Sequence, residues 1–377
     1  MKTSVIGFPR VGTLRELKFA SEKYFRKETG AEELLKEARR LRKTHWTVQK
    51  EAEIDYIPCN DFSFYDTVLD TAVLLGIVPK RYQELNLSAL DTYFAMARGY
   101  QGESGDVKAL AMKKWFNTNY HYIVPEAEDD TKIALVGEKL WEEYEEAKAL
   151  GIETKPVLTG PYTLLKLCRY TGSKTAEDFT DAVIAAYQQV FEKCAAHRIM
   201  WLQLDEPALV RDLSKEDIAL FHKIYENVLP CKKTVRILLQ TYFGDVRDIY
   251  KDLTELPFDG IGLDFIEGKE TVHLIEKYGF PKDKLLFAGL VNGKNIWRNH
   301  YDRTLNQLQQ LTGKGIQTVL STSCSLLHVP YTVKHETKLS EKYLDYFAFA
   351  EEKLSELKEL SGFAENPSYT QESVYKK

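Results

Sequence analysis

The sequence predicts an α/β fold, a (βα)8 barrel of the TIM type with extra N-terminal helices and a large insertion between the second and third barrel strands. Three observations support this prediction. Short β-rich apolar runs alternate with helical stretches eight times along the chain. Most of these runs end in a polar cluster with Gly, Pro, Asn or Asp, as strands do at the mouth of such a barrel. With 377 residues, 44% of them apolar, the chain can enclose one large core.

The predicted barrel strands are runs of apolar and β-branched residues bounded by turn-forming residues. They cover residues 3–6, 54–58, 156–158, 199–204, 235–240, 260–265, 285–291 and 318–321. The predicted helices have apolar residues at spacings of three and four. One starts near residue 14, and the others cover 31–53, 175–197, 214–228, 246–253, 270–278, 303–311 and 339–360. The tail from residue 362 lacks apolar periodicity, and we expect a linker or a frayed end there.

Roughly 95 residues separate the second predicted strand from the third, which is more than a simple connection requires. Within them, residues 64–75, 88–98 and 132–150 have helical periodicity, and Ser88 is placed to cap the second of these helices. The Gly- and charge-rich segment GYQGESGD predicts a loop. The next segment, AMKKWFNTNYHYIVPE, alternates aromatic and polar residues and predicts a strand or hairpin. We therefore expect the insertion to form structure of its own.

Charge and composition exclude several classes of protein. The chain has 51 basic and 56 acidic residues, so its net charge of −5 lacks the basic field of a general nucleic-acid binder. No stretch approaches the roughly 20 apolar residues that span a bilayer, and the start, MKTSVIGFPR, lacks the apolar core of a signal peptide. The five cysteines are scattered singly and form no CxxC pair, which fits a reducing compartment. We expect a soluble, cytoplasmic protein.

Three cations gather near the N-terminus, in the segment TSVIGFPRVGTLRELK. Arg15 and Lys18 lie three residues apart, so we expect them to share one face of a helix that starts near Leu14. Cations are unfavourable beside the partial positive charge of a helix N-terminus, and Arg10 adds a third one in the preceding loop. Clustered cations and free backbone N–H groups suit a multiply charged anion. The alternative is an ion pair of Arg15 with a nearby carboxylate and a solvated Lys18.

Carboxylates end several of the predicted strands, where a barrel keeps its catalytic groups. Asp205 and Glu206 close one strand, and Asp61 and Asp264 close two others. Paired acids can perform general acid–base or glycosidase chemistry, so a stand-alone barrel enzyme that uses Asp205, Glu206 and Asp264 is one alternative function. In the structural alternative, the acids bind N–H groups of the loops and hold the barrel rim together.

Other catalytic motifs are missing from the sequence. No HxC, CxxC or HExxH spacing provides a set of zinc ligands, and no GxSxG elbow provides a nucleophile. Cys324 and His328 lie four residues apart, which is as consistent with turn packing as with a catalytic pair. Neither GxGxxG nor a P-loop occurs, so a nucleotide-phosphate loop is not expected.

Several long segments resemble cobalamin-independent methionine synthase, the vitamin-B12-free homocysteine methyltransferase. They are GFPRVGTLRELKFASEKY, IPCNDFSFYDTVLDTAVLLG, MKKWFNTNYHYIVPE, WLQLDEPALV, LVNGKNIWRN and STSCSLLHVPYTVKHETKL, and they run from residue 3 to about residue 360 in the family's order. The resemblance is to the first half of that enzyme only. It implies that residues 1–361 form an N-terminal barrel and that residues 362–377 lead toward a C-terminal catalytic barrel absent from this chain.

The resemblance also implies a reaction and a site. The family transfers a methyl group from polyglutamylated 5-methyltetrahydrofolate to homocysteine. The residues that match the family's folate contacts are Arg15, Glu16, Leu17, Lys18 and Lys114, so we expect this half to hold the glutamate tail. We expect no catalytic residue in this chain and no turnover by the chain alone. A separate folate-binding subunit, with its catalytic half on another polypeptide, is a further alternative.

The family binds zinc in its second half, through a His-x-Cys, a Glu and a further Cys at strand ends. The corresponding strand ends of this chain carry Gln240, Thr241 and Tyr242 in place of the His-x-Cys, Asp264 in place of the Glu, and Cys324. Gln and Tyr are poor zinc ligands, and one Cys with one Asp cannot complete a site. The resemblance therefore implies a chain without metal or other cofactor, with methylfolate as its small-molecule ligand and the second barrel as its partner.

Overall fold

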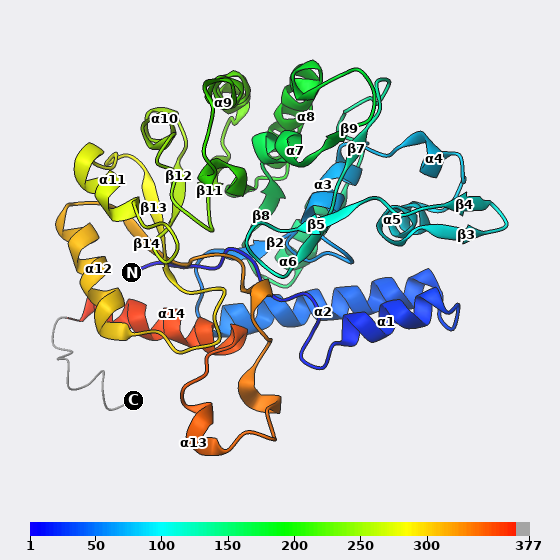
Figure 1. Ribbon diagram of the computed structural model, residues 1–377. Helices are drawn as coiled ribbons and strands as arrows, with labels where there is room; N and C mark the ends of the chain where they lie inside the picture. Colours follow the sequence, from blue (N-terminus) through cyan, green and yellow to red (C-terminus); the bar gives the residue numbers. More distant parts are fainter. Residues whose placement is uncertain (367–377) are drawn as a thin grey trace.

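The computed structural model describes residues 1–366, and its centre is a barrel of eight parallel strands (Figure 1). In chain order these are β1 (Thr3–Ser4), β2 (Ile57–Cys59), β8 (Thr154–Thr159), β10 (Trp201–Asp205), β11 (Arg236–Gln240), β12 (Gly260–Asp264), β13 (Leu285–Val291) and β14 (Thr318–Thr322). Neighbours in this order pair in parallel from β2 onward, and β14 pairs with β1. Two bonds close the ring between β1 and β2: Val5 N–H donates to the Tyr56 carbonyl at 3.3 Å, and Tyr56 N–H donates to the Thr3 carbonyl at 3.0 Å. The predicted (βα)8 fold is confirmed.

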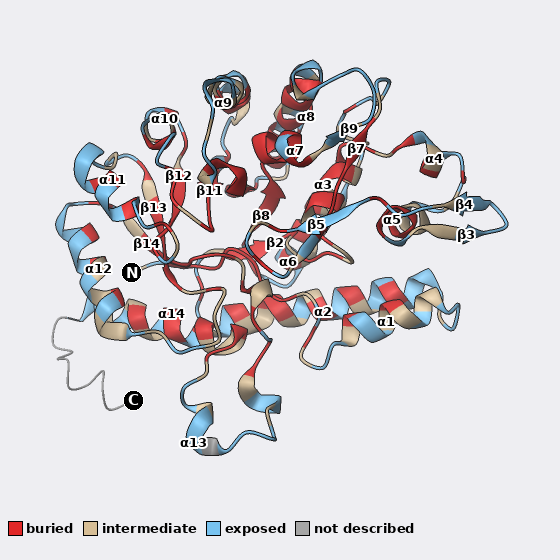
Figure 2. Ribbon diagram, viewed as in Figure 1, coloured by how far each residue is buried: buried red, intermediate tan, exposed pale blue. Residues whose placement is uncertain are grey.

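Helices cover the outside of the barrel, because each has a buried apolar face that packs against the strands (Figure 2). They are α2 (Ala31–Glu51), α6 (Lys139–Ala149), α8 (Ala176–Ala196), α9 (Lys215–Val228), α10 (Tyr250–Glu255), α11 (Thr271–Tyr278), α12 (Tyr301–Gly313) and α14 (Ala350–Glu365). Polar caps help to set where they begin. At α9, for example, the Ser214 hydroxyl accepts from Asp217 N–H at 3.1 Å. Among residues 1–366, no helix is long and apolar enough to span a membrane.

The interior of the barrel is filled with side chains. Four apolar residues form one cluster inside it: Trp201, Leu238, Phe287 and Val319. Next to them, the buried Lys155 ammonium donates to the Val5 carbonyl at 2.8 Å and to the Gln203 side chain. The Gln203 amide in turn donates to the Asp205 carboxylate at 2.7 Å. This chain of polar bonds continues the packing toward the strand ends, so the barrel is a packed core and not a channel.

The insertion between β2 and β8 forms a layer of its own beside the barrel, as predicted (Figure 1). Its elements are α3 (Thr67–Leu74), α4 (Lys80–Gln83), α5 (Ala89–Arg98), the hairpin of β3 (Tyr100–Gly102) with β4 (Gly105–Val107), the hairpin of β5 (Met112–Lys114) with β6 (His121–Ile123), and β7 (Glu126–Ala127). Asp66 joins two of these elements. Its carboxylate accepts from the N–H groups of Val68 and Leu69 at the start of α3 and from Ile123 N–H in β6, all within 2.9 Å.

Two predictions within the insertion are wrong, one of a loop and one of the start of a helix. The segment GYQGESGD is not a loop but contains the β3–β4 hairpin. The helix predicted over 132–150 begins only at Lys139, because the preceding residues serve another element. The N–H groups of Ala134, Val136 and Gly137 donate to the carbonyls of Leu74 and Leu75 at the end of α3, at 2.9–3.1 Å. These contacts satisfy the open carbonyls of α3 and keep residues 132–138 out of α6.

Two further differences lie outside the insertion. The sequence predicts no helix between the strand that ends at residue 158 and the helix that begins at residue 175, yet α7 (Pro161–Leu167) forms there and begins with a Pro in its first turn. The single helix predicted over 339–360 is broken into α13 (Glu341–Leu344) and α14. Between them, Phe347 stacks on Trp297 with ring centroids 5.1 Å apart, and Ala348 N–H donates to the Ile296 carbonyl at 2.8 Å. Of the predicted tail, residues 362–365 belong to α14, and residues 367–377 lie outside the described part of the chain.

Candidate functional site

A groove of about 410 Å³ lies between α1 (Glu16–Phe25), the segment before α3 and the end of α5. Its lining residues are Arg10, Val11, Arg15, Leu17, Lys18, Ser21, Glu22, Phe25, Phe64, Tyr65 and Arg98. We call this surface the basic groove, because four of these side chains are cations and only one is a carboxylate. Aromatic rings and Leu17 supply its apolar wall. Such a surface suits a ligand that carries several negative charges on a partly apolar chain.

Arg15 enters the groove from a strained backbone position. It is the residue before α1 and has φ 64° and ψ 33°, the left-handed region that side chains other than Gly rarely adopt. Leu17 N–H donates to the Val11 carbonyl at 3.2 Å, which folds residues 11–17 into a tight loop and holds this conformation. The prediction that Arg15 and Lys18 share one face of the helix is therefore wrong, because Arg15 lies before α1. The two cations reach the same groove from the loop and from the helix.

Of the other two predicted contacts in this segment, Leu17 lines the groove and Glu16 does not. Leu17 is 1% exposed, and its side chain lines the groove as part of the apolar wall. Glu16 is not among the lining residues, because its carboxylate folds back onto the loop. It accepts from Leu14 N–H at 2.9 Å and from the Thr13 hydroxyl at 3.2 Å. Glu16 thus holds the loop that presents Arg15, and it does not face the groove.

The remaining cations of the groove are held in different ways. Lys18 lies 3.7 Å from Glu22, and both side chains are exposed, so this pair is weak. Arg98, at the end of α5, stacks on the Phe25 ring at 3.5 Å and has no ion pair among the described residues. Arg10 donates from Nη1 to the carbonyls of Ser63 and Phe64 at 3.2 and 3.1 Å. Arg98 could not be predicted as a site residue from the sequence, because no local pattern links the end of α5 to the first helix.

Lys114 does not line the basic groove. It is exposed on β5 opposite His121, in the hairpin that projects from the insertion. The hairpin is attached beside the groove, since the Tyr120 hydroxyl donates to the carbonyl of Tyr65 at 2.8 Å and Tyr65 is a lining residue. The structure therefore brings Arg15, Leu17 and Lys18 together and places Lys114 on a neighbouring element.

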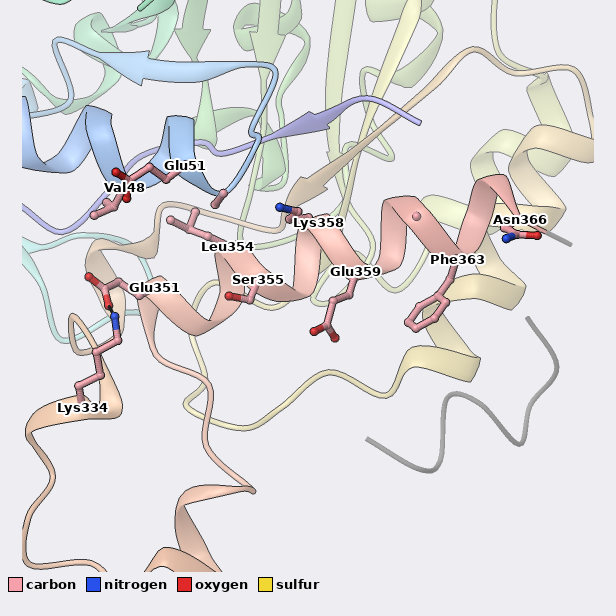
Figure 3. A pocket seen from close by; sticks show the side chains of 12 residues that line it. Val48, Glu51, Lys334, Glu351, Leu354, Ser355, Lys358, Glu359, Phe363 and Asn366 are labelled. Carbon is pink, nitrogen blue, oxygen red and sulfur yellow. Dashed lines mark hydrogen bonds and ion pairs between the residues drawn. The ribbon is translucent and has the colours of Figure 1, made fainter. Parts of the chain in front are cut away.

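A larger cavity lies elsewhere, between α2 and α14, and measures about 780 Å³ (Figure 3). None of the predicted site residues line it. Its lysines already have partners, because Lys334 pairs with Glu351 at 2.7 Å and Lys358 pairs with Glu53 at 2.8 Å. The smaller basic groove is the better candidate for an anionic ligand.

The carboxylates at the barrel mouth are held in structural bonds. Glu206 is fully buried and accepts from the N–H groups of Tyr162 and Thr163 at 3.0 and 2.7 Å and from the Tyr225 hydroxyl at 2.5 Å. Asp264 accepts from Phe243, Ile266 and Glu267 N–H groups within 2.9 Å. These bonds match the structural alternative, in which the acids hold the loops at the rim.

Three acids face a small cavity at the mouth. Asp61, Asp66 and Asp205 line about 30 Å³, together with Tyr242 and His328 among others. Burial raises the pKa of Asp205 to about 7 and that of Asp61 to about 6. The volume admits little more than a water molecule, so this cavity leaves no room for a sugar ring. This geometry gives no support to a stand-alone enzyme that uses these acids.

The strand ends that correspond to the family's zinc ligands do not fit a zinc ion in this chain. Asp264 already accepts three N–H groups, and burial raises the pKa of the Cys324 thiol, which disfavours the thiolate that zinc requires. Gln240 and Tyr242 complete the set, and the Tyr242 hydroxyl donates to Asp205 at 3.0 Å. Within residues 1–366, no three His, Cys, Asp or Glu side chains are grouped so that they could hold a metal ion.

Comparisons with known proteins agree with this organisation. A family model described as cobalamin-independent synthase, N-terminal domain, matches residues 2–315. A protein named 5-methyltetrahydropteroyltriglutamate–homocysteine methyltransferase from Campylobacter jejuni subsp. doylei is 56% identical over 373 residues, which are 98% of this chain and 50% of that protein. The protein of the same name from Streptococcus suis is 58% identical over 360 residues, which are 96% of this chain and 48% of that protein. The chain thus spans about half the length of the curated relatives it matches.

A solved structure supports the fold. The B12-independent methionine synthase from a Shewanella species, in complex with selenomethionine, superimposes with a TM-score of 0.61. The match covers 96% of each chain at 14% sequence identity. Identity this low supports the shared architecture alone.

Proposed function

The chain belongs to the cobalamin-independent methionine synthase family, through its N-terminal domain, and we propose that it holds the polyglutamate tail of 5-methyltetrahydrofolate while a second barrel transfers the methyl group to homocysteine. In the proposed reaction the homocysteine sulfur takes the methyl group from N5 of the folate, which gives methionine and tetrahydrofolate. The residues of this chain would bind and orient the folate through its tail. The second barrel would correspond to the half of the relatives that this chain does not match, and it would carry the zinc and the homocysteine.

The observation that carries this proposal is the basic groove. Arg10, Arg15, Lys18 and Arg98 reach it from three separate segments, and Glu22 is the only carboxylate among its lining residues. Each glutamate of the tail adds one carboxylate, so separated cations can pair with successive residues of the tail. The apolar wall formed by Leu17, Phe25 and Phe64 can cover the methylene groups between these charges.

Calorimetric titration of the pure chain tests the proposal, with 5-methyltetrahydrofolate carrying one glutamate or three. We expect the triglutamate form to bind more tightly, and the difference to shrink as salt is raised. Lys18→Ala and Arg98→Ala should each weaken triglutamate binding about tenfold, because each removes a charge-assisted contact. Lys114→Ala should have a similar effect if the tail extends from the groove along the β5–β6 hairpin.

Lys23→Ala is the matched control, since Lys23 is an exposed lysine on the same helix and does not line the groove. It should bind the triglutamate form as the wild type does. Equal binding of the two folates, or equal losses in Lys18→Ala and Lys23→Ala, would contradict a tail site in the groove. If neither folate binds, adding a separately produced second half to the same cell shows whether the site forms only between the two barrels.

A further inference from the structure

A second cationic cavity lies beside α12 and α14. Of these helices, α12 lies on the side of the barrel away from α1 (Figure 1). It measures about 180 Å³ and is lined by the loop after β13, the first turns of α12, and α14. The ionisable lining residues are Arg298, His300, Arg303 and Lys353, and no carboxylate is among them. The proposed binding of folate uses none of these residues.

Lys353 is a buried cation without a close counter-ion. Its side chain is 1% exposed, and its ammonium donates to the Trp297 carbonyl at 3.2 Å and, weakly, to Asn295 Oδ1 at 3.5 Å. No carboxylate lies within 4 Å of it among the described residues. The nearby Glu352 accepts from Phe349 N–H, and Glu356 accepts from Asn299 N–H through Oε1, while its buried Oε2 has no hydrogen-bond partner. Both carboxylates act on the Lys353 charge only from beyond 4 Å. A buried ammonium without a carboxylate in contact is costly, so an anion in the cavity would lower the free energy of the folded state.

The polar groups around Lys353 are mostly donors. Arg298 and Arg303 have no ion pair in the described part of the chain, and each carries several N–H donors. The amide oxygen of Asn292 accepts from the N–H groups of Lys294 and Asn295 at 2.9 and 3.0 Å, which leaves its NH2 group as a donor. The Asn295 oxygen is likewise occupied, by Trp297 N–H at 3.3 Å and by Lys353. A ligand in this cavity must therefore supply acceptors and negative charge.

We propose that this cavity binds a tetrahedral oxyanion, either inorganic phosphate or the phosphate group of a small monoester. Two guanidinium groups and a buried ammonium match a doubly charged anion with several acceptor atoms better than they match a single carboxylate. The position fits this ligand class, because β13 is the seventh strand of the barrel and the loops after the seventh and eighth strands hold phosphate groups in many barrels. Trp297 is 54% exposed and lines the same cavity, so it offers a surface for the organic part of a monoester.

The fluorescence of Trp297 provides a way to measure ligand binding in this cavity. The other four tryptophans are at most 6% exposed, so a ligand in this cavity should change mainly the fluorescence of Trp297. We expect inorganic phosphate, titrated in a phosphate-free buffer at low salt, to shift this fluorescence saturably, and chloride at matched ionic strength to leave it unchanged. Arg298→Gln and Arg303→Gln should each weaken phosphate binding about tenfold. Both side chains lie at the surface, so these variants should fold normally.

Two control variants separate this cavity from other cationic surfaces. Arg39→Gln changes an exposed arginine on α2 that lines neither cavity, and it should leave the affinity for phosphate unchanged. Lys18→Ala alters the basic groove and should also leave it unchanged, so failure of the folate proposal would not affect this test. A second titration with phenyl phosphate identifies the source of the anion. Tighter binding than phosphate, lost in Trp297→Ala when followed by calorimetry, indicates a monoester, and equal binding indicates the free ion.

The opposite results would overturn the proposal. One is the absence of a saturable response to either phosphate compound, confirmed by calorimetry. Another is binding that Arg298→Gln and Arg303→Gln leave intact, or that Lys18→Ala abolishes, because the anion would then bind elsewhere. Equal responses to phosphate and chloride would indicate general ionic screening.

Discussion

At the scale of single residues, Arg15 combines a strained backbone with an exposed charge. A left-handed conformation costs a residue with a Cβ about 1–2 kcal/mol, and Arg15 adopts it with φ 64°. Strain of this kind persists where surrounding contacts hold it, and here the loop bonds of Glu16 and Leu17 do so. The strain directs the side chain into the basic groove, which is consistent with a role in binding.

We predict that Arg15→Gly separates stability from binding. Glycine adopts the left-handed region freely, so the variant should be as stable as the wild type or more stable, by up to about 1 kcal/mol in urea unfolding. The same variant should bind 5-methyltetrahydrofolate triglutamate about tenfold more weakly, because it lacks the guanidinium. A variant that loses stability and keeps its affinity would contradict both parts of this interpretation.

Asp205 provides a prediction on pH. Burial raises its pKa from the ordinary 3.8 to about 7, so between these values the folded chain keeps a proton that the unfolded chain has released. The stability contributed by this group is complete below about pH 4 and is lost as the pH rises through about 7. Asp205→Asn does not titrate, and its amide can still bond Gln203 and Tyr242. The free energy of unfolding of the variant, relative to that of the wild type, should rise by about 1 kcal/mol per pH unit across this window.

Urea unfolding of both proteins at intervals between about pH 4.5 and 8 measures this difference. Other groups titrate in the same range, including His328, whose pKa burial lowers to about 4. Their contributions cancel in the comparison, because both proteins contain them. A difference that stays constant with pH would show that Asp205 ionises normally in the folded chain.

At the scale of elements, Asp66 links α3 to the β5–β6 hairpin. One oxygen caps α3 through Val68 and Leu69 N–H, and the other accepts from Ile123 N–H in β6. We predict that Asp66→Ala lowers the free energy of unfolding by about 2–4 kcal/mol, because three buried donors lose their acceptor. Hydrogen exchange should become faster at the Ile123 amide as well as at the amides of α3.

Ser88→Ala is the matched control for this prediction, since Ser88 caps only α5, through Asp91 N–H at 3.1 Å. This variant should lower the free energy of unfolding by about 1 kcal/mol and leave hydrogen exchange in the β5–β6 hairpin unchanged. If Asp66→Ala affects α3 and leaves the hairpin protected, then other contacts of the hairpin, such as the Tyr120 bond, are sufficient to hold it.

At the scale of the whole molecule, the chain matches about half the length of its curated relatives. We predict that the pure chain transfers no methyl group from methylfolate to homocysteine, even with zinc added. The reason is the donor set. Asp264 and Tyr242 are engaged in other bonds, and within residues 1–366 no three His, Cys, Asp or Glu side chains are grouped so that they could hold a metal ion. Methionine formation, measured with and without a separately produced second half of the Campylobacter relative, checks this. Robust turnover by the chain alone would refute it.

Much of the barrel could be predicted because its signals are local. Each strand is an apolar run and each covering helix has a periodic apolar face, so short windows of sequence are enough to find them. The bounds that were wrong depend on distant partners. Residues 132–138 are extended because they bond the end of α3, and the break before α14 depends on Trp297, about fifty residues away in the sequence.

For the candidate site, the sequence was enough to predict that cations collect at the start of α1 and that acids end the barrel strands. What these residues contact depends on the folded chain. Folding placed Arg98 beside Arg15 and Lys18, turned Glu16 away, set Lys114 on a separate hairpin, and engaged Glu206 and Asp264 with backbone N–H groups. The physical reason is that a charge is visible in one residue, whereas its partners and its exposure depend on chain segments that only folding brings together.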